Sequence, residues 1–586
     1  MKKPLVSLPL RRCRRNDWLG AFPPAIRWLL WGRGRLVAAA LAMGCCCQAD
    51  GLPPEKVFDL VIRQGRIVDG TGNPWFTGDI ALRGDRIAAI SRRLLSEVGD
   101  AEVVNAEGLV VAPGFVDIHS HSDWILFEDG RGLGKVFQGV TTEILGEGGS
   151  AGPFKGKLVP RPVSVQGRVE RVDSMGRYFD LIDEAEVGVN VASYVGLGNV
   201  WQSVMGHSFD SPTEGQLAAM KSLLGEAMDQ GALGLSCQLM MPPGLLVATD
   251  QLVELCAVVR AGGGIFSTHI RNEGQGVFEA VRQAIEVGER ARLPVDIIHL
   301  KIADQAFWGR MSEVIELIEQ ARRRGVNVQA NVYPYTRGNN NLSSIIPPWA
   351  HEGGRTAMLA RLRDPELRDR LKQDIRKGIE GWYNHFTAVG GDWRRMLISA
   401  NNRYQGMTMD QVIGARRRTE MDDSLDLLFE LLLEFDGSVG TVYAHHTESD
   451  MNLAMKQPWC SIGSDGAAYA VSGILRRGNP HPRNFGTFPR VLGHYVRERG
   501  LLTLEDAVRK MTSLNAIKVG LSRRGLIKEG WYADLVVFDE DEVMDRATYT
   551  DPFQYGVGMV HVLVNGQFVI RDRVPTEKKP GRALRR

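Results

Sequence analysis

Cysteine is scarce in this 586-residue chain beyond its first 50 residues. Only Cys237, Cys256 and Cys460 occur there, and three scattered thiols do not make a disulfide framework. We expect each of them to be a buried, apolar thiol. The chain also lacks internal repeats and low-complexity tracts, and its 24% of charged residues is ordinary for a folded protein.

A clustered basic face is missing as well. The formal net charge is only +2, and the first 44 residues hold nine Lys and Arg but a single acidic residue, Asp17. The rest of the chain is therefore mildly acidic. Because nucleic-acid binding needs a concentrated basic surface, we predict no nucleic-acid partner.

The apolar run near the N-terminus, LVAAALAMG, is too short to span a bilayer. It follows the basic stretch RRCRRNDWLGAFPPAIRWLLWGRGR, as in a secretory signal. AMGC, which ends at Cys45, resembles the cleavage box of bacterial lipoproteins, whose cysteine takes a lipid. We predict that residues 1–50 are a leader and that the protein is exported, either periplasmic or lipid-anchored at Cys45. The alternative is a misassigned start codon upstream of a cytoplasmic enzyme.

Both ends of the remaining chain have the period-two pattern of β-strands. FDLVIRQGRIVDGTGNPWFTGDIALRGDRIAAI, beginning at Phe58, alternates apolar and polar residues between Gly, Asn and Asp turns. GLIKEGWYADLVVFD and VGMVHVLVNGQFVIRDRV repeat this pattern near the C-terminus, and Asn565-Gly566 is a strong hairpin signal. We predict one small β-sandwich domain built from residues 56–113 and 522–586.

Between these segments, in residues 114–521, short apolar strands alternate with amphipathic helices. Repeated β-α units indicate a parallel sheet, and their number favours a (β/α)8 TIM-like barrel in an α/β protein. Residues 337–440 break the rhythm with polar, Arg- and Asp-rich helices. We predict that this segment is an insertion over the barrel mouth that shapes specificity.

Polar residues interrupt one apolar strand in GFVDIHSHSDW, which begins at Gly114. Side chains alternate along a strand, so Asp117, His119 and His121 face the same way. Two adjacent imidazoles in a low-dielectric interior are explained by metal ligation, since neutral imidazole is a common zinc ligand. The alternative is a pair of hydrogen-bonded core histidines.

Three further predicted strands each end in a residue that can bind a metal ion. His269 ends GIFSTH, His299 ends PVDIIH and Asp465 ends CSIGSD. The C-terminal ends of barrel strands meet at one mouth, which is where TIM-barrel enzymes have their active sites. The shared pattern therefore predicts that these residues gather around a divalent ion.

These motifs carry a family resemblance. APGFVDIHSH, the terminal β segments, the two later histidines and the late aspartate resemble the amidohydrolase superfamily of metal-dependent hydrolases. Within it, QGVTTEILGEGGSAGP, STHIRNEG, NVYPYTRG, HPRNFGTFPRVLG and MTSLNAIKVGL resemble the N-acyl-D-amino-acid deacylases, or D-aminoacylases. The resemblance extends from about Phe58 to the C-terminus.

The resemblance implies two metal positions and one or two Zn²⁺ ions per chain. It places His119, His121 and Asp465 at one position and His269 and His299 at the second, tighter one. A cysteine in a GNCG-like turn ligates there in the family, but this chain reads GEGG, with Gly148 at the cysteine's place. We infer that Glu147 replaces the thiolate as a bridging or single ligand. A carboxylate is a harder ligand than a thiolate, which leaves the metal's identity open.

The absence of a lysine in one strand narrows the choice among branches of the superfamily. GALGLSCQL (231–239) contains no lysine that could be carboxylated to bridge two metals. Its absence argues against the hydantoinase and dihydroorotase branch and leaves Glu147 as the bridge.

The resemblance also implies roles in the reaction. Asp465 takes a proton from the attacking water and passes it to the leaving amine. Tyr333 steadies the oxyanion, and Tyr335, on the same face of the strand, is its rival. Lys301 matches the family's lysine and, two residues beyond His299, points inward if the strand continues. Arg271 stands in the same relation to His269, so both are candidate cations for the α-carboxylate of the substrate.

The predicted function is hydrolysis of small-molecule N-acyl-D-amino acids to a carboxylate and a free D-amino acid. Cyclic-amide hydrolysis and, from a different class, a non-catalytic binding lipoprotein are the alternatives. The oligomeric state stays open.

Overall fold

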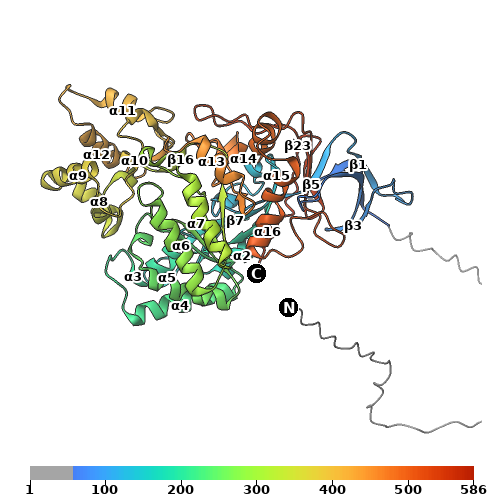
Figure 1. Ribbon diagram of the computed structural model, residues 1–586, viewed down its shortest axis with the longest axis horizontal. Helices are drawn as coiled ribbons and strands as arrows, with labels where there is room; N and C mark the ends of the chain where they lie inside the picture. The colour runs from blue at the N-terminus through green and yellow to red at the C-terminus, as the bar shows by residue number, and fades with distance from the viewer. Residues whose placement is uncertain (1–56) are drawn as a thin grey trace, which may run out of the picture. The chain divides into compact units, whose positions relative to one another are not determined.

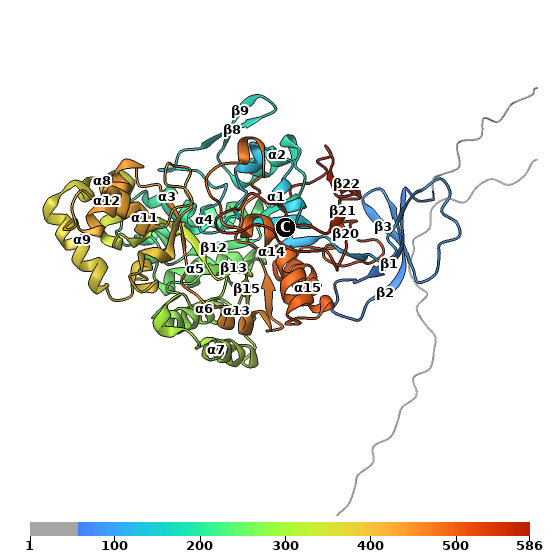
Figure 2. The same cartoon turned by 90° about the horizontal axis from the view of Figure 1, so that it is seen from above.

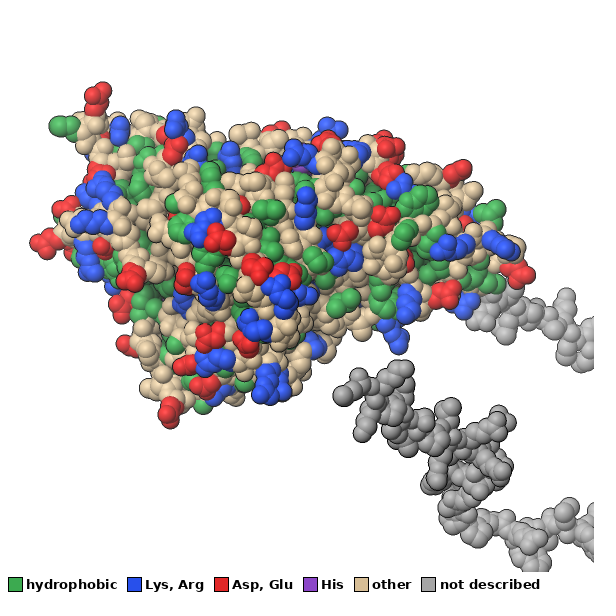
Figure 3. All heavy atoms as spheres, viewed as in Figure 1, with side chains coloured by type: hydrophobic (Ala, Val, Ile, Leu, Met, Phe, Trp, Pro, Cys, Tyr) green, Lys and Arg blue, Asp and Glu red, His purple; other side chains and the backbone are tan. Residues whose placement is uncertain are grey.

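The computed structural model describes residues 57–586, which belong to one compact unit, Lys56–Arg586 (Figure 1). The predicted leader and Cys45 lie outside the described residues. None of the described helices combines the length and the hydropathy that crossing a membrane requires. On the face drawn in Figure 3, acidic and basic side chains of the described residues are interspersed, so this face has no extended surface of one charge.

Strands from both ends of the described chain form one nine-stranded sheet. The N-terminal strands are β1 (Leu60–Ile67), β2 (Phe76–Arg83), β3 (Arg86–Ser91), β4 (Glu102–Asn105) and β5 (Val110–Pro113). The C-terminal strands are β20 (Leu535–Phe538), β21 (Met559–Val564), β22 (Gln567–Arg571) and β23 (Val574–Pro575). Antiparallel pairing of β20 with β5 joins the two sets, which lie side by side in Figure 2. The predicted β domain built from both chain ends is thereby confirmed.

The central part of the chain is a parallel barrel. Its strands are β6 (Phe115–Asp117), β7 (Val140–Leu145), β10 (Asn190–Ser193) continued by β11 (Val195–Gly196), β12 (Gly234–Gln238), β13 (Ile265–His269), β14 (Val295–Ile297), β15 (Val328–Val332) and β19 (Cys460–Ile462). Neighbouring strands pair in parallel, and a parallel bridge between Ser120 and Gly466 closes the ring. The predicted (β/α)8 fold is confirmed.

Helices between the strands cover the outside of the barrel (Figures 1 and 2). They include α2 (Met175–Ala185), α3 (Leu197–Met205), α4 (Glu214–Asp229), α5 (Thr249–Ala261), α6 (Val277–Ala291), α7 (Met311–Arg323), α13 (Glu448–Met455) and α15 (Leu504–Met511). In α6 the buried residues recur every three or four positions, which is the apolar stripe of a helix that packs on a core. At Gly288 of α6 a Cβ atom would lie 2.4 Å from Val295 Cγ2, so glycine permits close packing on β14.

The insertion has a sheet and a core of its own. Strands β16 (Gly338–Asn341), β17 (Met396–Ile398) and β18 (Gly440–Tyr443) form an antiparallel sheet. Helices α8 (Gly354–Arg363), α9 (Pro365–Lys377), α10 (His385–Ala388), α11 (Met409–Arg416) and α12 (Ser424–Glu434) complete the unit around a separate apolar cluster. Strand β18, which ends at Tyr443, pairs with β16 and β17 rather than with the barrel, so it belongs to the sheet of the insertion, which was predicted to end at about residue 440.

A buried lysine holds the seam between the first and last barrel strands. Lys135, in α1 (Leu133–Val136), donates from Nζ to Asp117 Oδ2 at 2.7 Å, Ser464 Oγ at 2.8 Å and the Gly466 carbonyl at 3.0 Å. Asp117 Oδ1 also accepts from the Ser464 backbone N–H at 2.8 Å. Both charged side chains are fully buried. All three ammonium donors have acceptors, which is the condition for burying such a charge.

We predict that Lys135→Met lowers the free energy of unfolding by about 3–5 kcal/mol, because it leaves the Asp117 carboxylate buried without its cation. Urea denaturation measures the change. Lys155→Met, which removes the exposed pair with Glu226, is the matched control and should cost less than about 1 kcal/mol. Equal losses in the free energy of unfolding for the two variants would show that the buried ion pair stabilises the fold no more than the exposed one.

Candidate metal centre

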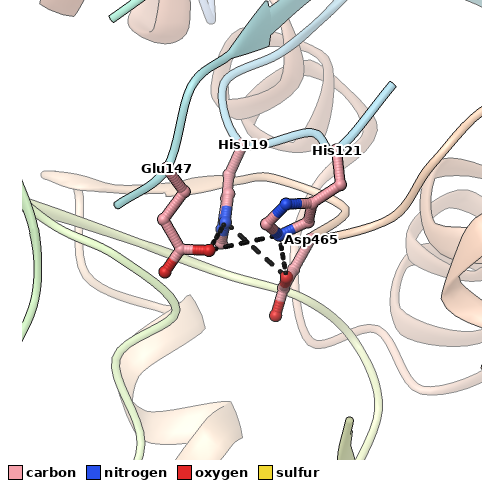
Figure 4. A group of neighbouring side chains, drawn as sticks. All are labelled: His119, His121, Glu147 and Asp465. Carbon is pink, nitrogen blue, oxygen red and sulfur yellow. Dashed lines mark hydrogen bonds and ion pairs between the residues drawn. The ribbon is translucent and has the colours of Figure 1, made fainter. Parts of the chain in front are cut away.

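Four side chains that follow barrel strands converge at the barrel mouth. His119 and His121 follow β6, Glu147 follows β7 and Asp465 follows β19. Figure 4 shows all four pointing toward one another. His121 Nε2 lies 2.9 Å from Asp465 Oδ1 and 3.1 Å from Glu147 Oε2, and His119 Nε2 lies 3.0 Å from the same Glu147 oxygen. The four ligand atoms lie within 4.8 Å of one another, so they can hold one cation.

A second group shares one member with the first. Glu147, His269 and His299 bring ligand atoms within 4.8 Å of one another. Glu147 therefore faces both groups, as a bridging carboxylate does. Its Oε1 atom is buried and has no hydrogen-bond partner among the described residues. Buried carboxylate oxygens are rarely left unpaired, and a metal ion in this position would satisfy it.

The backbone of the GEGG turn directs Glu147 inward. Gly146 and Gly148 both have left-handed backbones, with φ of 92° and 61°. A Cβ atom at position 148 would lie 2.7 Å from Gln238 Cβ. A side chain at Gly148 is therefore strained and crowded, and the ligand comes from the preceding residue instead. Burial would raise the pKa of the Glu147 carboxyl, but His119 and His121 lower it well below its usual value.

The two later histidines are oriented by hydrogen bonds. His269 Nδ1 lies 3.0 Å from the Ile270 carbonyl, which can only accept, so Nδ1 carries the proton and Nε2 is free to bind a metal. His299 Nδ1 lies 3.1 Å from Glu273 Oε1. Burial and the charge of Lys301 lower the pKa of His299 to about 4, which keeps the ring neutral as ligation requires.

Backbone strain accompanies this site. His299 has a φ of 37° and Asp465 a φ of 52°, both in the left-handed region that non-glycine residues seldom adopt. Each is the residue whose side chain turns into the cavity at the end of its strand. Strain of this kind persists where the surrounding structure imposes it, and it concentrates at functional sites.

The groups open onto a cavity of about 490 Å³ lined by residues that include His121, Glu147, His269, His299, Lys301, Tyr333 and Asp465. The Tyr333 hydroxyl is buried without a hydrogen-bond partner among the described residues. Lys301 reaches this wall, but its Nζ already lies 2.6 Å from Glu273 Oε1 and 2.9 Å from His299 Nδ1. Its charge is therefore engaged by the Glu273 carboxylate.

Two residues that the sequence offered for substrate binding make their hydrogen bonds away from the cavity. Arg271 donates to the backbone carbonyls of Leu245 and Val247 at 2.6 and 2.8 Å. The Tyr335 hydroxyl donates to Asp545 Oδ2 at 3.2 Å. Neither lines the cavity. Strand β13 ends at His269 and β15 ends at Val332, so the alternation of faces does not extend to these two residues.

Sequence reasoning missed Arg483 and Glu273, both buried beside the cluster. Arg483 Nη1 donates to Asp465 Oδ2 at 2.6 Å, and its guanidinium lies 5.0 Å from the Tyr333 ring centroid. Burial would raise the pKa of the Asp465 carboxyl, but Arg483 and His119 lower it, so Asp465 is ionised. Both missed residues lie in motifs that carry the family resemblance, HPRNFGTFPRVLG and STHIRNEG, which was the available signal.

A family model described as Amidohydrolase family matches residues 102–570. The chain belongs to the amidohydrolase family. Its relatives include a D-aminoacylase from Alcaligenes xylosoxydans xylosoxydans, 34% identical over 92% of this chain and 99% of the relative. An N-acyl-D-glutamate deacylase from the same organism is also 34% identical, over 91% of this chain and 97% of the relative.

Among solved structures, the amidohydrolase is similar to an N-acyl-D-glutamate deacylase from Bordetella Bronchiseptica, complexed with zinc and a phosphonate inhibitor that mimics the tetrahedral intermediate. The TM-score is 0.74 at 30% identity, covering 90% of this chain and 100% of the other.

We predict that Glu147→Ala weakens zinc binding by more than about 100-fold, the upper effect of residues that only orient ligands, because Glu147 faces both groups. Metal content per chain after dialysis against limiting zinc measures the loss. Glu107→Ala, at an exposed glutamate, is the control. Unchanged zinc content in Glu147→Ala would show that the Glu147 carboxylate is not a metal ligand.

Proposed function

We propose that this amidohydrolase is a zinc-dependent deacylase that converts N-acyl-D-amino acids to a carboxylate and a free D-amino acid. One observation carries the proposal: His121, Glu147, His269, His299 and Asp465 line a single cavity, and His119 Nε2 lies 3.0 Å from Glu147 Oε2 beside it. The names of relatives that match nearly the whole chain, D-aminoacylase and N-acyl-D-glutamate deacylase, support the substrate class.

The donor set fits zinc, because it consists of imidazoles and carboxylates alone. His119, His121 and Asp465 would hold one ion and His269 and His299 a second, with Glu147 between them. Bound zinc supplies a Lewis acid and an activated water at neutral pH.

The chain's own residues move the protons. Asp465 is ionised and lies at the cavity wall, where it can accept the proton of the attacking water and deliver it to the leaving amine. Tyr333 lines the same cavity, and its buried hydroxyl, which has no hydrogen-bond partner among the described residues, is the candidate donor to the developing oxyanion.

The α-carboxylate of the substrate needs a cation, and Arg483 suits it better than Arg271 or Lys301. Arg483 uses one guanidinium nitrogen for Asp465, and a planar guanidinium has five N–H donors in all. The remaining donors are available to a carboxylate, which arginine binds with two parallel hydrogen bonds. Arg271 lies away from the cavity, and Glu273 already holds Lys301.

Hydrolysis of N-acetyl-D-methionine, N-acetyl-L-methionine and a hydantoin tests this proposal. We expect kcat/KM for the D-enantiomer to exceed that for the L-enantiomer by at least about 100-fold, as for a site that fixes several substituents at once. Cleavage of hydantoin alone would favour a cyclic-amide hydrolase. Absence of turnover with zinc fully loaded would favour a binding protein without catalysis.

Asp465→Asn is the matched variant for the same assay. It should retain zinc, because its role is proton transfer more than metal binding, and lower kcat by about 10²–10⁴-fold. Near-normal turnover in this variant would refute the assigned role of Asp465.

We further propose that the deacylase is exported and is either periplasmic or lipid-anchored at Cys45. The basic stretch, the short apolar run and AMGC at the N-terminus support this proposal. Metabolic labelling with radioactive palmitate should mark a lipid-anchored protein, and Cys45→Ser should abolish the label. An unlabelled protein that begins downstream of the leader and stays in the cytoplasm would favour the misassigned start.

A further inference from the structure

The insertion supplies a wall of the cavity that none of the steps above uses. Its polar lining residues are Asn339, Asn340, His385, Ser399, Asn401 and His445. Among the described lining residues of the insertion, none carries a carboxylate, an ammonium or a guanidinium group. This wall is therefore polar but uncharged as long as its histidines are neutral.

Hydrogen bonds fix the proton positions on two adjacent histidines. His446 Nε2 lies 2.8 Å from the Tyr335 carbonyl, which can only accept, so His446 carries its proton on Nε2 and has a lone pair on Nδ1. His445 Nδ1 lies 3.0 Å from that lone pair and must donate to it. His445 consequently has its own lone pair on Nε2.

Burial keeps both rings neutral. It lowers the pKa of His446 to about 3 and the pKa of His445 well below its usual value. The tautomer chain from Tyr335 through His446 to His445 therefore holds at neutral pH.

The Nε2 atom of His445 lies beside Gly338, and both residues line the cavity. A Cβ atom at Gly338 would lie 2.8 Å from His445 Nε2, so the absence of a side chain there lets the ring lie against β16. His445 lines the cavity, and none of the described residues hydrogen-bonds to its Nε2 atom. The Nδ1 atom of neighbouring His385, whose ring centroid is 6.3 Å away, is buried without a hydrogen-bond partner among the described residues.

The cations of the cavity are all paired with carboxylates. Arg477 contacts both oxygens of Glu128, at 2.7 and 2.9 Å. The charges of Lys301 and Arg483 face Glu273 and Asp465, close to the metal ligands. An acidic group at the insertion wall would meet a lone pair and no free cation, whereas an N–H or O–H group would find an acceptor.

We propose that His445 Nε2, held as an acceptor by His446, determines specificity for the amino-acid side chain. The preferred substrates are then N-acyl-D-amino acids whose side chain ends in an uncharged hydrogen-bond donor, a carboxamide or a hydroxyl. This inference rests on the proposed deacylase function and names the substrate class within it.

Three substrates of similar size test the inference: the N-acetyl derivatives of D-glutamine, D-glutamate and D-methionine. D-glutamine and D-glutamate are nearly isosteric and differ in whether the side chain donates. We expect the wild-type deacylase to favour D-glutamine over D-glutamate by about 100-fold in kcat/KM, since a site built for a donor rejects its analogue strongly.

Two variants distinguish the effect of the hydrogen-bond acceptor on His445 from the effect of side-chain packing in the cavity. His445→Leu removes the acceptor and should lower kcat/KM for D-glutamine by about tenfold while changing D-methionine by less than about threefold. His446→Gln retains a donor for the Tyr335 carbonyl but removes the Nδ1 lone pair, which frees His445 to carry its proton on Nε2. The preference for D-glutamine over D-glutamate should then shrink. His207→Gln, at an exposed histidine away from the cavity, is the control.

The wild-type ratio alone can overturn the inference, whether or not the variants fold. Cleavage of D-glutamate as fast as D-glutamine would do so, as would an unchanged D-glutamine to D-methionine ratio in folded His445→Leu. Failure to cleave any of the three derivatives would instead overturn the deacylase function, and this inference with it.

Discussion

The buried contact between Lys135, Asp117 and Ser464 is the constraint on which the metal centre depends. The first and last barrel strands, β6 and β19, are not paired along their length and meet through a single bridge beyond their ends. His119 and His121 continue one strand and Asp465 the other, so the geometry of the ligands follows from this seam. A well-packed apolar contact would often stabilise the fold as well as an ion pair does. What the lysine adds is directional: three acceptors from both sides of the seam fix their relative position.

Much of this architecture could be predicted because it depends on local patterns of apolar and polar residues in the sequence. Period-two alternation marked the terminal strands, and the β-α rhythm marked the barrel. Five of the six metal-facing residues could be found for one physical reason, which is that each stands at the end of an apolar strand and such ends share one mouth. Arg483 and Glu273 have no such signature. They lie in loop or helix positions, and Arg483 meets Asp465 only through the closure of the barrel, which no local periodicity records.

The predicted roles of Arg271 and Tyr335 have a common origin. Both rested on extending the alternation of faces two residues beyond a known position, past the end of the strand. The left-handed φ angles of His299 and Asp465 show that the backbone turns sharply at such strand ends. Alternation is a property of extended backbone and ends where that conformation ends. Lys301 reaches the cavity wall despite this turn, but as the partner of Glu273 rather than as a free cation.

In the GEGG turn, the sequence shows that the family's cysteine is absent, but only the structure shows why a side chain does not fit at that position. A thiol at position 148 would need a left-handed backbone and would press its Cβ atom against Gln238. Moving the donor to residue 147 avoids both problems, and the longer glutamate side chain reaches the gap between the two groups of ligands. A carboxylate has two oxygens where a thiolate has one sulfur. Glu147 lies near His119 and His121 with one oxygen and 3.9 Å from His299 Nε2 with the other, so this one residue would contribute to both metal positions.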